Sequence, residues 1–411
     1  GDVYKRQAKF PVSRITVNLA PARVRKEGTV YDLPILLGIL AAAEEISPLP
    51  QGAAFLGELS LSGALRPVMG VLPMALTAAR LGIDTLYVPE ANAAEATLAD
   101  GLTVYGVTDV GQLIAHLKGE QVMTPAPRWT PGHQDRPLPD FADVMGQENV
   151  KRALEIAAAG GHNVLLVGSP GAGKSMLARR LPSILPDMTR AEALQTTEIY
   201  SVAGMTDPRH PLVDTRPFRS PHHTASTVSL SGGGGIPRPG EISLAHNGVL
   251  FLDELPEFGR SVLEVLRQPL EEKKIVVSRA RYNVEYPANF TLVAAMNPCP
   301  CGYYNHPTKE CTCSPGSVHR YMGRISGPLM DRIDLHVEVT PVTPRELSAA
   351  APGEASAAVR ERVVRARAVQ EARFGGVEGV HTNSMMNSAM LREYCRLDAA
   401  SAALLELSLI H

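Results

Sequence analysis

The segment Gly168-Ser-Pro-Gly-Ala-Gly-Lys-Ser175 constrains the fold of this 411-residue chain more than any other feature. It matches the phosphate-binding P-loop at every fixed position and directly follows Asn163-Val-Leu-Leu-Val167, an apolar run suited to a buried strand. Its glycines allow backbone N–H groups to surround nucleotide phosphates, and a helix over Met176–Leu181 is expected to follow. Lys174 is placed to reach the β- and γ-phosphates, and the Ser175 hydroxyl to bind Mg²⁺. The expected ATP-binding residues are Gly168, Ser169, Pro170, Gly171, Ala172, Gly173, Lys174 and Ser175.

A second apolar run, Gly248-Val-Leu-Phe-Leu252, ends in the acidic pair Asp253-Glu254. A P-loop enzyme needs a buried parallel strand of this kind, because the strand delivers carboxylates to the metal ion. Asp253 is expected to hold the Mg²⁺ shell, and Glu254 to polarise the attacking water. An acidic pair alone is usually a solvated strand end. Together with the P-loop, however, it predicts ATP hydrolysis.

Composition sets the limits of this interpretation. The hydrophobic content of 45% is enough for two or three domains with their own cores. The formal net charge is −2, so any contact with nucleic acid must come from a local basic surface. The chain has no apolar run long enough to span a membrane and no visible signal peptide, so we expect no membrane association and a cytoplasmic location. It begins with Gly1 rather than Met, and we expect it to be a fragment whose first seven residues are foreign to the gene.

The clearest boundary is the proline-rich stretch 121–139, which is typical of a semi-rigid linker. It separates a domain over 1–120 from a P-loop domain over 140–344, and a helical region is expected over 345–411. In the first domain the patterns predict strands at Arg14–Leu19, Phe55–Leu61 and Thr85–Val88, and helices at Leu33–Ala43 and Val71–Leu81. In the second they predict a helix at Glu148–Ala159 and strands that alternate with helices through Asp334–Val339. This alternation indicates an α/β fold with a doubly wound parallel sheet.

Several long segments resemble one family, the ComM/YifB group of magnesium-chelatase-like AAA+ ATPases, and the similarity runs from about Phe10 to Leu407. The segments are Val17-Asn-Leu-Ala-Pro-Ala22, Gly57-Glu-Leu-Ser-Leu61, Arg216-Pro-Phe-Arg-Ser-Pro-His-His223, Gly240-Glu-Ile-Ser-Leu-Ala-His-Asn-Gly248, Ala294-Ala-Met-Asn-Pro-Cys-Pro-Cys-Gly302 and Ser326-Gly-Pro-Leu-Met-Asp-Arg-Ile-Asp334. The resemblance implies a hexameric ring with ATP sites between subunits. It also implies that Asn297 senses the γ-phosphate and that Arg332 is an arginine finger for the neighbouring subunit. A planar guanidinium suits this role, although Arg324 is a competing candidate and Arg332 could instead form a structural ion pair with Asp331 or Asp334.

The N-terminal domain resembles the proteolytic domain of Lon, which has a ribosomal S5 domain 2-like α/β fold and, in family terms, uses a Ser–Lys dyad. Here Lys26-Glu-Gly-Thr-Val-Tyr-Asp-Leu-Pro34 contains no serine, and Met74 stands where the lysine is expected. Thr29 has no neighbour in the sequence that looks like its base, so we expect no peptidase activity and a role in assembly or partner binding. The domain is expected to lack its first strands, and the helical lid to stop before an arginine that senses nucleotide.

Four of the five cysteines form two close pairs, Cys299-Pro-Cys301 and Cys311-Thr-Cys313. Such pairs suit tetrahedral thiolate coordination, and they predict a structural zinc site, since four protein ligands leave no open position. The alternative is a loop of reduced thiols without metal. Cys395 stands alone on an expected helix and is predicted to lie in the core.

Basic residues gather in two segments. Arg216, Arg219, His222 and His223 precede the glycine-rich loop Gly232–Gly235, and Arg279 and Arg281 lie at the tip of an expected hairpin between Ile275–Val277 and Val284–Tyr286. In related AAA+ rings, inserts at these places face the central pore, so these residues are candidates for contact with DNA. The alternative is that they make local or intersubunit hydrogen bonds, with the histidines ordering the loop near the nucleotide.

Three functions are compatible with these features. The favoured one is an ATP-driven DNA motor, a helicase or branch-migration factor of the ComM type in natural transformation or recombination, as the resemblance implies. The second is a magnesium-chelatase-like motor subunit that remodels a protein partner. The third is a protein that uses ATP only for assembly. The first predicts that DNA stimulates ATP hydrolysis in a salt-sensitive manner.

Overall fold

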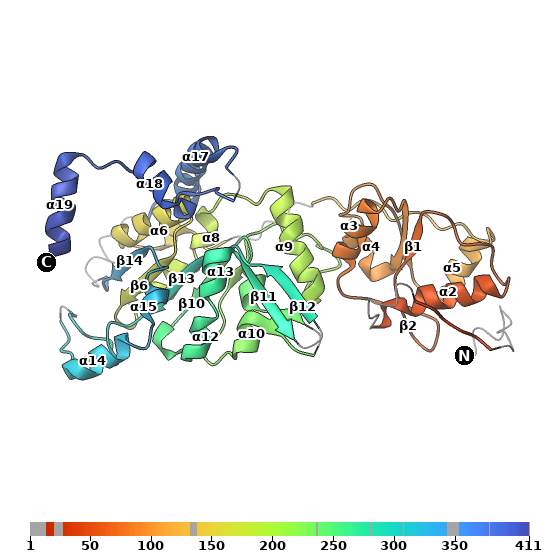
Figure 1. Ribbon diagram of the computed structural model, residues 1–411, viewed down its shortest axis with the longest axis horizontal. Helices are drawn as coiled ribbons and strands as arrows, with labels where there is room; N and C mark the ends of the chain where they lie inside the picture. The colour runs from red at the N-terminus through yellow and green to blue at the C-terminus, as the bar shows by residue number, and fades with distance from the viewer. Residues whose placement is uncertain are drawn as a thin grey trace. The chain divides into compact units, whose positions relative to one another are not determined.

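The computed structural model describes residues 14–19, 28–131, 138–235, 237–279, 282–306, 308–342, 353–377 and 379–410. The chain divides into two compact units (Figure 1), of which the first comprises Gly1–Asp135 with Met188–Thr215 and the second Arg136–Asp187 with Arg216–His411. Residues 188–215 therefore group with the N-terminal unit, although the sequence division assigned them to 140–344. Among the described residues, no helix is long and apolar enough to cross a membrane.

The N-terminal unit is built on a three-stranded parallel sheet with the order β1-β4-β5. The strands are β1 (Ala53–Phe55), β4 (Thr85–Pro89) and β5 (Thr103–Val107). Successive residues of β4 point to opposite faces, so Leu86 and Val88 join one core cluster and Tyr87 joins another. The helices are α2 (Asp32–Ala42), α3 (Val71–Arg80), α4 (Glu90–Ala96) and α5 (Val110–Leu117).

Two strand predictions for this unit were wrong. Residues Phe55–Leu61 do not form one strand, because the chain leaves β1 after Phe55 and continues in a separate hairpin of β2 (Glu58–Leu59) and β3 (Leu65–Arg66). Residues Arg14–Leu19 form no strand, since a strand needs a paired neighbour and no ladder of the described residues includes them. The helices predicted at 33–43 and 71–81 and the strand at 85–88 are confirmed within one residue.

Helix α9 (Arg190–Ala203) is the element by which residues 188–215 pack on the N-terminal unit. A capping box between Thr189 and Glu192 starts the helix. Near its other end, the carbonyl oxygen of Ser201 accepts a hydrogen bond of 3.0 Å from the Gly70 N–H at the start of α3. Buried Glu95 accepts from the backbone N–H of Leu72 at 3.2 Å beside the Ser201 hydroxyl, and burial raises the pKa of this carboxyl.

The second unit contains a five-stranded, fully parallel sheet with the order β14-β6-β13-β10-β7. The strands are β6 (Val164–Gly168), β7 (Phe218–Arg219), β10 (Val249–Leu252), β13 (Thr291–Met296) and β14 (Leu335–Val339). The four residues of β10 are all buried, as expected of a strand covered on both faces. This sheet confirms the predicted parallel α/β architecture and places the P-loop strand between β13 and β14.

Helices and short inserts surround this sheet. They are α6 (Glu148–Gly160), α7 (Lys174–Ala178), α8 (Leu181–Ile184), α10 (Thr227–Ser231), α11 (Glu241–Leu244), α12 (Arg260–Glu264), α13 (Arg267–Glu272), α14 (Pro315–Met322), α15 (Gly327–Met330) and α17 (Ser356–Phe374). The inserts also include the pair β8 (Gly232–Gly233) and β9 (Arg238–Pro239), the 3₁₀ turn η3 (Leu255–Glu257) and the predicted hairpin, which is β11 (Lys274–Arg279) with β12 (Tyr282–Pro287). The helix predicted at 176–181 is broken in two, because Pro182 has no N–H to continue the helical hydrogen bonds.

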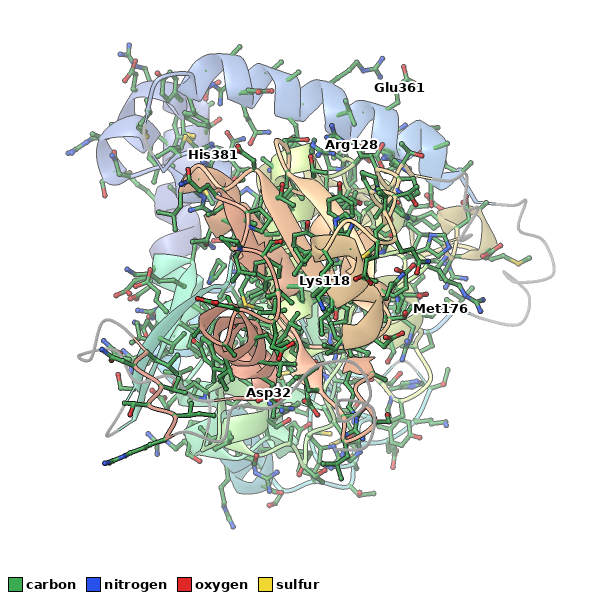
Figure 2. The ribbon with its side chains drawn as sticks, turned by 90° about the vertical axis from the view of Figure 1, so that its right-hand side faces the viewer. Asp32, Lys118, Arg128, Met176, Glu361 and His381 are labelled. Carbon is green, nitrogen blue, oxygen red and sulfur yellow. The ribbon has the colours of Figure 1, made fainter. Side chains whose placement is uncertain are left out.

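The C-terminal part is helical only in segments. Helix α17 packs on α6 and α8, and Figure 2 shows Glu361 projecting from its outer face. It is followed by η4 (Asn383–Met385), α18 (Ser388–Tyr394) and α19 (Ala399–Ile410), and residues 345–352 of the predicted helical region lie outside the described residues. Cys395 is the first residue after α18 and is exposed, so its predicted place in the core was wrong: the short helix ends before this position and leaves it to solvent.

Candidate nucleotide site

The P-loop connects the end of β6 to the start of α7. Gly168 is the last residue of β6, and a side-chain Cβ there would lie only 2.3 Å from the carbonyl oxygen of Val339 in the neighbouring β14. Gly171 and Gly173 have φ angles of +80° and +91°, which L-residues with side chains rarely adopt. The loop opens into a cavity of about 360 Å³ lined by Pro170, Gly171, Ala172, Gly173, Lys174, Ser175, Met176, Asp253, Glu254, Met296 and Asn297. The structure thus gathers the predicted phosphate, metal and sensor residues around one cavity.

Lys174 lies inside the P-loop. Its Nζ donates hydrogen bonds to the carbonyl oxygens of Gly168 at 2.6 Å and Ser169 at 3.0 Å, and to Oδ1 of Asn297 at 3.2 Å. Burial lowers the pKa of Lys174, while the carboxylates of Asp253 and Glu254 act in the opposite direction. This side chain therefore joins the P-loop at the end of β6 to Asn297 at the end of β13.

Ser175 and Asp253 supply the oxygen atoms expected at a magnesium ion. Ser175 Oγ donates to Asp253 Oδ2 at 2.6 Å, and Asp253 Oδ1 accepts from the backbone N–H of Glu254 at 3.0 Å. Hydroxyl and carboxylate oxygens at the end of adjacent elements suit Mg²⁺, which takes few protein ligands and completes its shell with phosphate and water. The pair is thus suited to hold Mg²⁺ against a nucleotide.

Glu254 has an unusual backbone and an unexpected partner. Its φ angle is +52°, which turns the chain sharply after β10. Nδ1 of His223 lies 3.0 Å from Oε2 of Glu254, and the ring of His223 lies 4.1 Å from that of His222. This contact agrees with the alternative in which the histidines order the loop near the nucleotide. The carboxylate expected to polarise water is therefore held by a side chain from the segment that follows β7.

Sequence reasoning missed Tyr321, which lies in α14. The backbone of Asn297 hydrogen-bonds its hydroxyl, and burial, followed by the nearby charge of Glu257, raises the pKa of Tyr321 to about 12. No sequence signal could have found this residue, because α14 is separated from β13 by an irregular loop. Tyr321 fixes the backbone at the position where Asn297 reaches Lys174.

The two candidate finger arginines lie at different places around the sheet. Arg332 pairs with Glu271 and donates to the carbonyl oxygen of Pro328, rather than forming the expected alternative pairs with Asp331 or Asp334. Its own carbonyl oxygen accepts from Nδ2 of Asn163, the residue just before β6, at 2.9 Å. Arg324 instead pairs with Glu257 at 2.8 Å, shortly after Glu254.

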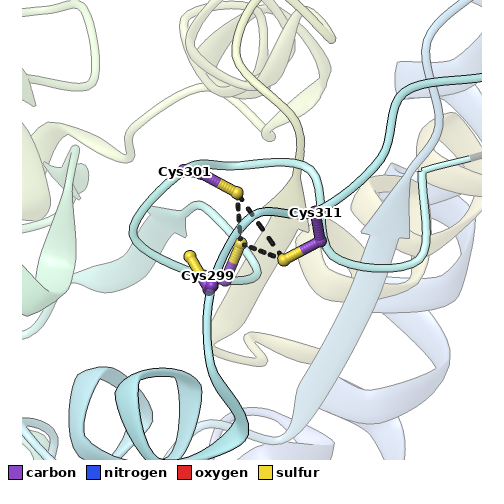
Figure 3. A group of neighbouring side chains, drawn as sticks. Cys299, Cys301 and Cys311 are labelled. Carbon is purple, nitrogen blue, oxygen red and sulfur yellow. Dashed lines mark hydrogen bonds between the residues drawn. The ribbon is translucent and has the colours of Figure 1, made fainter.

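The four predicted zinc ligands meet in one cluster, of which Figure 3 labels Cys299, Cys301 and Cys311. The sulfur atoms of Cys299, Cys301, Cys311 and Cys313 all lie within 4.8 Å of one another. The separations are 3.3 Å for Cys299–Cys301, 3.7 Å for Cys299–Cys311 and 3.6 Å for Cys301–Cys311, and all four thiols are free. These distances exceed the 2.05 Å of a disulfide bond.

The thiols of this cluster differ in acidity. The backbone N–H of Tyr303 is the largest cause that lowers the pKa of Cys301 to about 6. At Cys311 the backbone of Cys313 lowers the pKa, but burial and the neighbouring thiols of Cys301 and Cys299 outweigh it and raise the value to about 12. Because the four sulfur atoms lie so close together, repulsion disfavours several negatively charged thiolates unless a cation balances their charge.

The basic residues proposed for DNA contact are placed differently from one another. Arg216 donates to the carbonyl oxygens of Pro186 at 2.5 Å and Asn247 at 2.8 Å, and Arg219 forms a bidentate pair with Glu241 at 2.7 Å. Arg279 ends β11, although its side chain lies outside the described residues. Arg281, at the hairpin tip, also lies outside the described residues.

In the N-terminal unit, Met74 is a half-buried residue of α3 that packs on the core. Thr29 has a neighbour that the sequence did not reveal, because its Oγ1 donates to Oε2 of Glu58 at 2.5 Å. Glu58 also pairs with Arg66 at 3.5 Å, at the surface. A surface carboxylate paired with arginine is a poor base for a threonine hydroxyl.

Comparisons with known proteins agree with this architecture. Residues 140–347 match the family model described as "Magnesium chelatase, subunit ChlI", residues 2–92 match "Subunit ChlI of Mg-chelatase", and residues 353–410 match "Magnesium chelatase, subunit ChlI C-terminal". The chain is 45% identical to competence protein ComM of Haemophilus influenzae, over 98% of this chain and 79% of that protein. It is 44% identical to the uncharacterized protein YifB of Escherichia coli, over 98% and 78%. It is also 27% identical to Lon protease 2 of Bacillus subtilis, over 39% and 33%. On these grounds the chain belongs to the ComM/YifB group of the magnesium-chelatase ChlI family, and it is an AAA+ ATPase.

Proposed function

We propose that this protein is an ATP-driven ring motor that acts on DNA, as a helicase or branch-migration factor in natural transformation or recombination. The observation that carries the ATP-driven part is the cavity in which Lys174, the Ser175–Asp253 pair, Glu254 and Asn297 meet. The DNA part is supported by 45% identity to a protein named for competence. We place its action in the cytoplasm.

The residues of the cavity divide the work of hydrolysis. The P-loop amides and Lys174 bind the phosphates, and Ser175 and Asp253 would hold Mg²⁺, which would supply positive charge to the phosphates. Glu254 orients the attacking water once its carboxylate leaves His223, and Asn297 contacts the γ-phosphate. We also propose that the cysteine cluster holds one structural zinc ion.

In a hexameric ring, Arg332 would serve the ATP of the neighbouring subunit. Strand β6 has five residues and is about 16 Å long, with the P-loop at its carboxyl end and Arg332 beside its amino end. The backbone of Arg332 therefore lies at the opposite end of β6 from the P-loop of its own chain. In a head-to-tail ring, this end is available to the ATP of the neighbouring subunit, where an arginine would stabilise charge on the transferred phosphoryl group.

DNA contact is best supported at the β11–β12 hairpin. Arg216 donates hydrogen bonds to backbone carbonyls, and Arg219 pairs with Glu241. We therefore propose that these two arginines stabilise the insert rather than bind DNA phosphates. Arg279 ends β11, one strand of a two-stranded ribbon, and Arg281 comes two residues later in the sequence. Exposed Arg238 on β9 adds a further cation of the inserts. Repeated around a ring, these residues would form a basic channel in a protein of net charge −2.

The test is the ATPase rate with and without single-stranded and branched DNA across a salt series. We expect stimulation that fades as salt rises, and its loss in an Arg279→Ala/Arg281→Ala double variant. Arg365→Ala is the matched control, because Arg365 is exposed on α17 and pairs with Glu361 one turn away. Equal rates with and without DNA would overturn the DNA proposal and favour the second candidate, a chelatase-like motor that remodels a protein partner, which the family match supports. Nucleotide-dependent oligomerisation without turnover would favour a protein that uses ATP only for assembly.

A further inference from the structure

The loop that carries the cysteine cluster begins two residues after Asn297 and ends just before α14. None of its described residues belongs to a helix or a strand. A loop of this length without internal structure gains most from a crosslink that fixes its ends. Cys299 is fully buried at one end of the loop, and Cys313 lies at the other.

The cluster has the dimensions of a tetrahedral thiolate site. Four sulfur atoms bound at about 2.3 Å to one zinc ion lie roughly 3.8 Å apart. The three sulfur–sulfur separations of 3.3, 3.7 and 3.6 Å and the upper limit of 4.8 Å for the whole cluster are close to this value. Ion binding therefore requires only small sulfur shifts, and four protein ligands make the site structural.

The same loop touches the nucleotide site at two points. Gly302 packs so tightly on the P-loop that a Cβ there would lie 2.5 Å from Cδ of Pro170. At the far end of the loop, α14 returns Tyr321 to the backbone of Asn297. The contacts thus run from Asn297 through Cys299 and Gly302 to the P-loop, and return to Asn297 through Lys174. Tyr321 holds the backbone of Asn297 from the other end of the loop.

We infer that a zinc ion held by Cys299, Cys301, Cys311 and Cys313 fixes this loop against the P-loop, and thereby positions Asn297 for hydrolysis of the γ-phosphate. The inference rests on the proposed ATPase function and structural zinc. The cysteines are positioning residues, since none of them lines the nucleotide cavity. Without the ion the loop loosens and Asn297 no longer keeps its place beside Lys174. Misplacement of such a group by about 1 Å lowers turnover roughly 100-fold.

The experiment compares Cys313→Ser, Cys313→His and the control Cys395→Ser, whose exposed thiol lies outside the cluster. Metal per chain is measured by mass spectrometry, and site geometry by the absorption bands of the cobalt-substituted protein. We expect one zinc in the wild type, its loss in Cys313→Ser, and its retention in Cys313→His, because imidazole replaces a thiolate in zinc sites. We expect kcat to fall roughly 100-fold in Cys313→Ser, with KM for ATP changed much less, and to recover in Cys313→His.

A second variant separates docking of the loop from its metal content. Gly302→Ala should keep zinc but lower kcat, since its methyl group collides with Pro170. Zinc loss in Cys313→Ser with unchanged kcat would overturn the positioning role and leave the zinc site standing. Metal-free wild type with full activity would overturn both. If the wild type hydrolyses no ATP, the proposed function fails, and amide hydrogen exchange still decides the inference: faster exchange over 293–297 in Cys313→Ser supports it, and unchanged exchange refutes it.

Discussion

At the scale of single residues, Lys174 and Glu254 have separable tasks. Lys174 is the buried cation of the P-loop, whereas Glu254 lies at the exposed end of β10 and contacts no P-loop residue among the hydrogen bonds of the described chain. We expect Lys174→Ala to lose ATP binding. We expect Glu254→Gln to keep binding and to lower kcat roughly 100-fold or more, because the amide is a poor base for water. Nucleotide titration and single-turnover kinetics distinguish the two, and wild-type rates in both variants would remove these residues from the site.

His223 supplies a second prediction at this scale. Its contact of 3.0 Å with the Glu254 carboxylate competes with the water that the carboxylate must orient. A polar contact worth about 1 kcal/mol corresponds to roughly a fivefold change in the population of free carboxylate. We therefore expect His223→Ala to raise the DNA-independent ATPase rate about fivefold. His222→Ala is the control, since Nδ1 of His222 contacts Thr224 instead. A decrease in rate in His223→Ala would mean that the histidine positions Glu254 productively.

The sequence allowed prediction of those site residues that follow directly on recognisable strands. The P-loop, Asp253–Glu254 and Asn297 each come at the carboxyl end of an apolar run, and parallel strands bring such ends to one edge. The partners that hold them could not be predicted. Tyr321 and Glu271 reach Asn297 and Arg332 from helices distant in sequence, and only the folded backbone brings them together.

At the scale of elements, Glu95 makes the packing of α9 on the N-terminal unit sensitive to pH. Burial, its largest cause, raises the folded-state pKa above the ordinary value of 4.5. The stability contributed by the protonated carboxyl is therefore fully present below about pH 4.5 and is lost as the pH rises through the folded pKa. As the pH rises from about 4.5 through the folded-state pKa, we expect the unfolding free energy of Glu95→Gln to increase relative to that of the wild type. Above the folded-state pKa, this difference should level off. Thermal unfolding across a pH series measures it, and a constant difference would contradict the prediction.

A helix or strand could be predicted where its own sequence pattern determines its structure. Prediction was poorer where the structure depends on contacts with elements distant in the sequence. The long apolar runs gave β6 and β10, because a strand buried on both faces must be apolar throughout. The two-residue strand β7 has no such run, and it exists because it pairs with β10. The grouping of α9 with the N-terminal unit is likewise a matter of tertiary contacts with α3, which periodicity does not encode.

At the scale of the whole molecule, the proposed ring can be tested by mixing two inactive proteins. Lys174→Ala destroys a subunit's own cavity but leaves Arg332 intact, and Arg332→Ala does the reverse. If the arginine acts on the neighbour's ATP, a mixed ring contains interfaces that join an intact cavity to an intact Arg332. In random head-to-tail rings of equal parts, about one quarter of the interfaces are of this kind, so the mixture should recover up to about one quarter of the wild-type rate.

The control is a mixture of Lys174→Ala with Glu254→Gln. Lys174 and Glu254 line the same cavity of one chain. Every subunit of this mixture therefore has a damaged cavity, and no arrangement in the ring restores an active site. Recovery in the first mixture and none in the control would establish a shared site between subunits. If mixed rings are stable and the first mixture recovers no activity, Arg332 is not the arginine finger and serves only as the ion-pair partner of Glu271. Recovery when Arg324→Ala takes the place of Arg332→Ala would assign the finger to Arg324, whose pairing with Glu257 would then have to open on assembly.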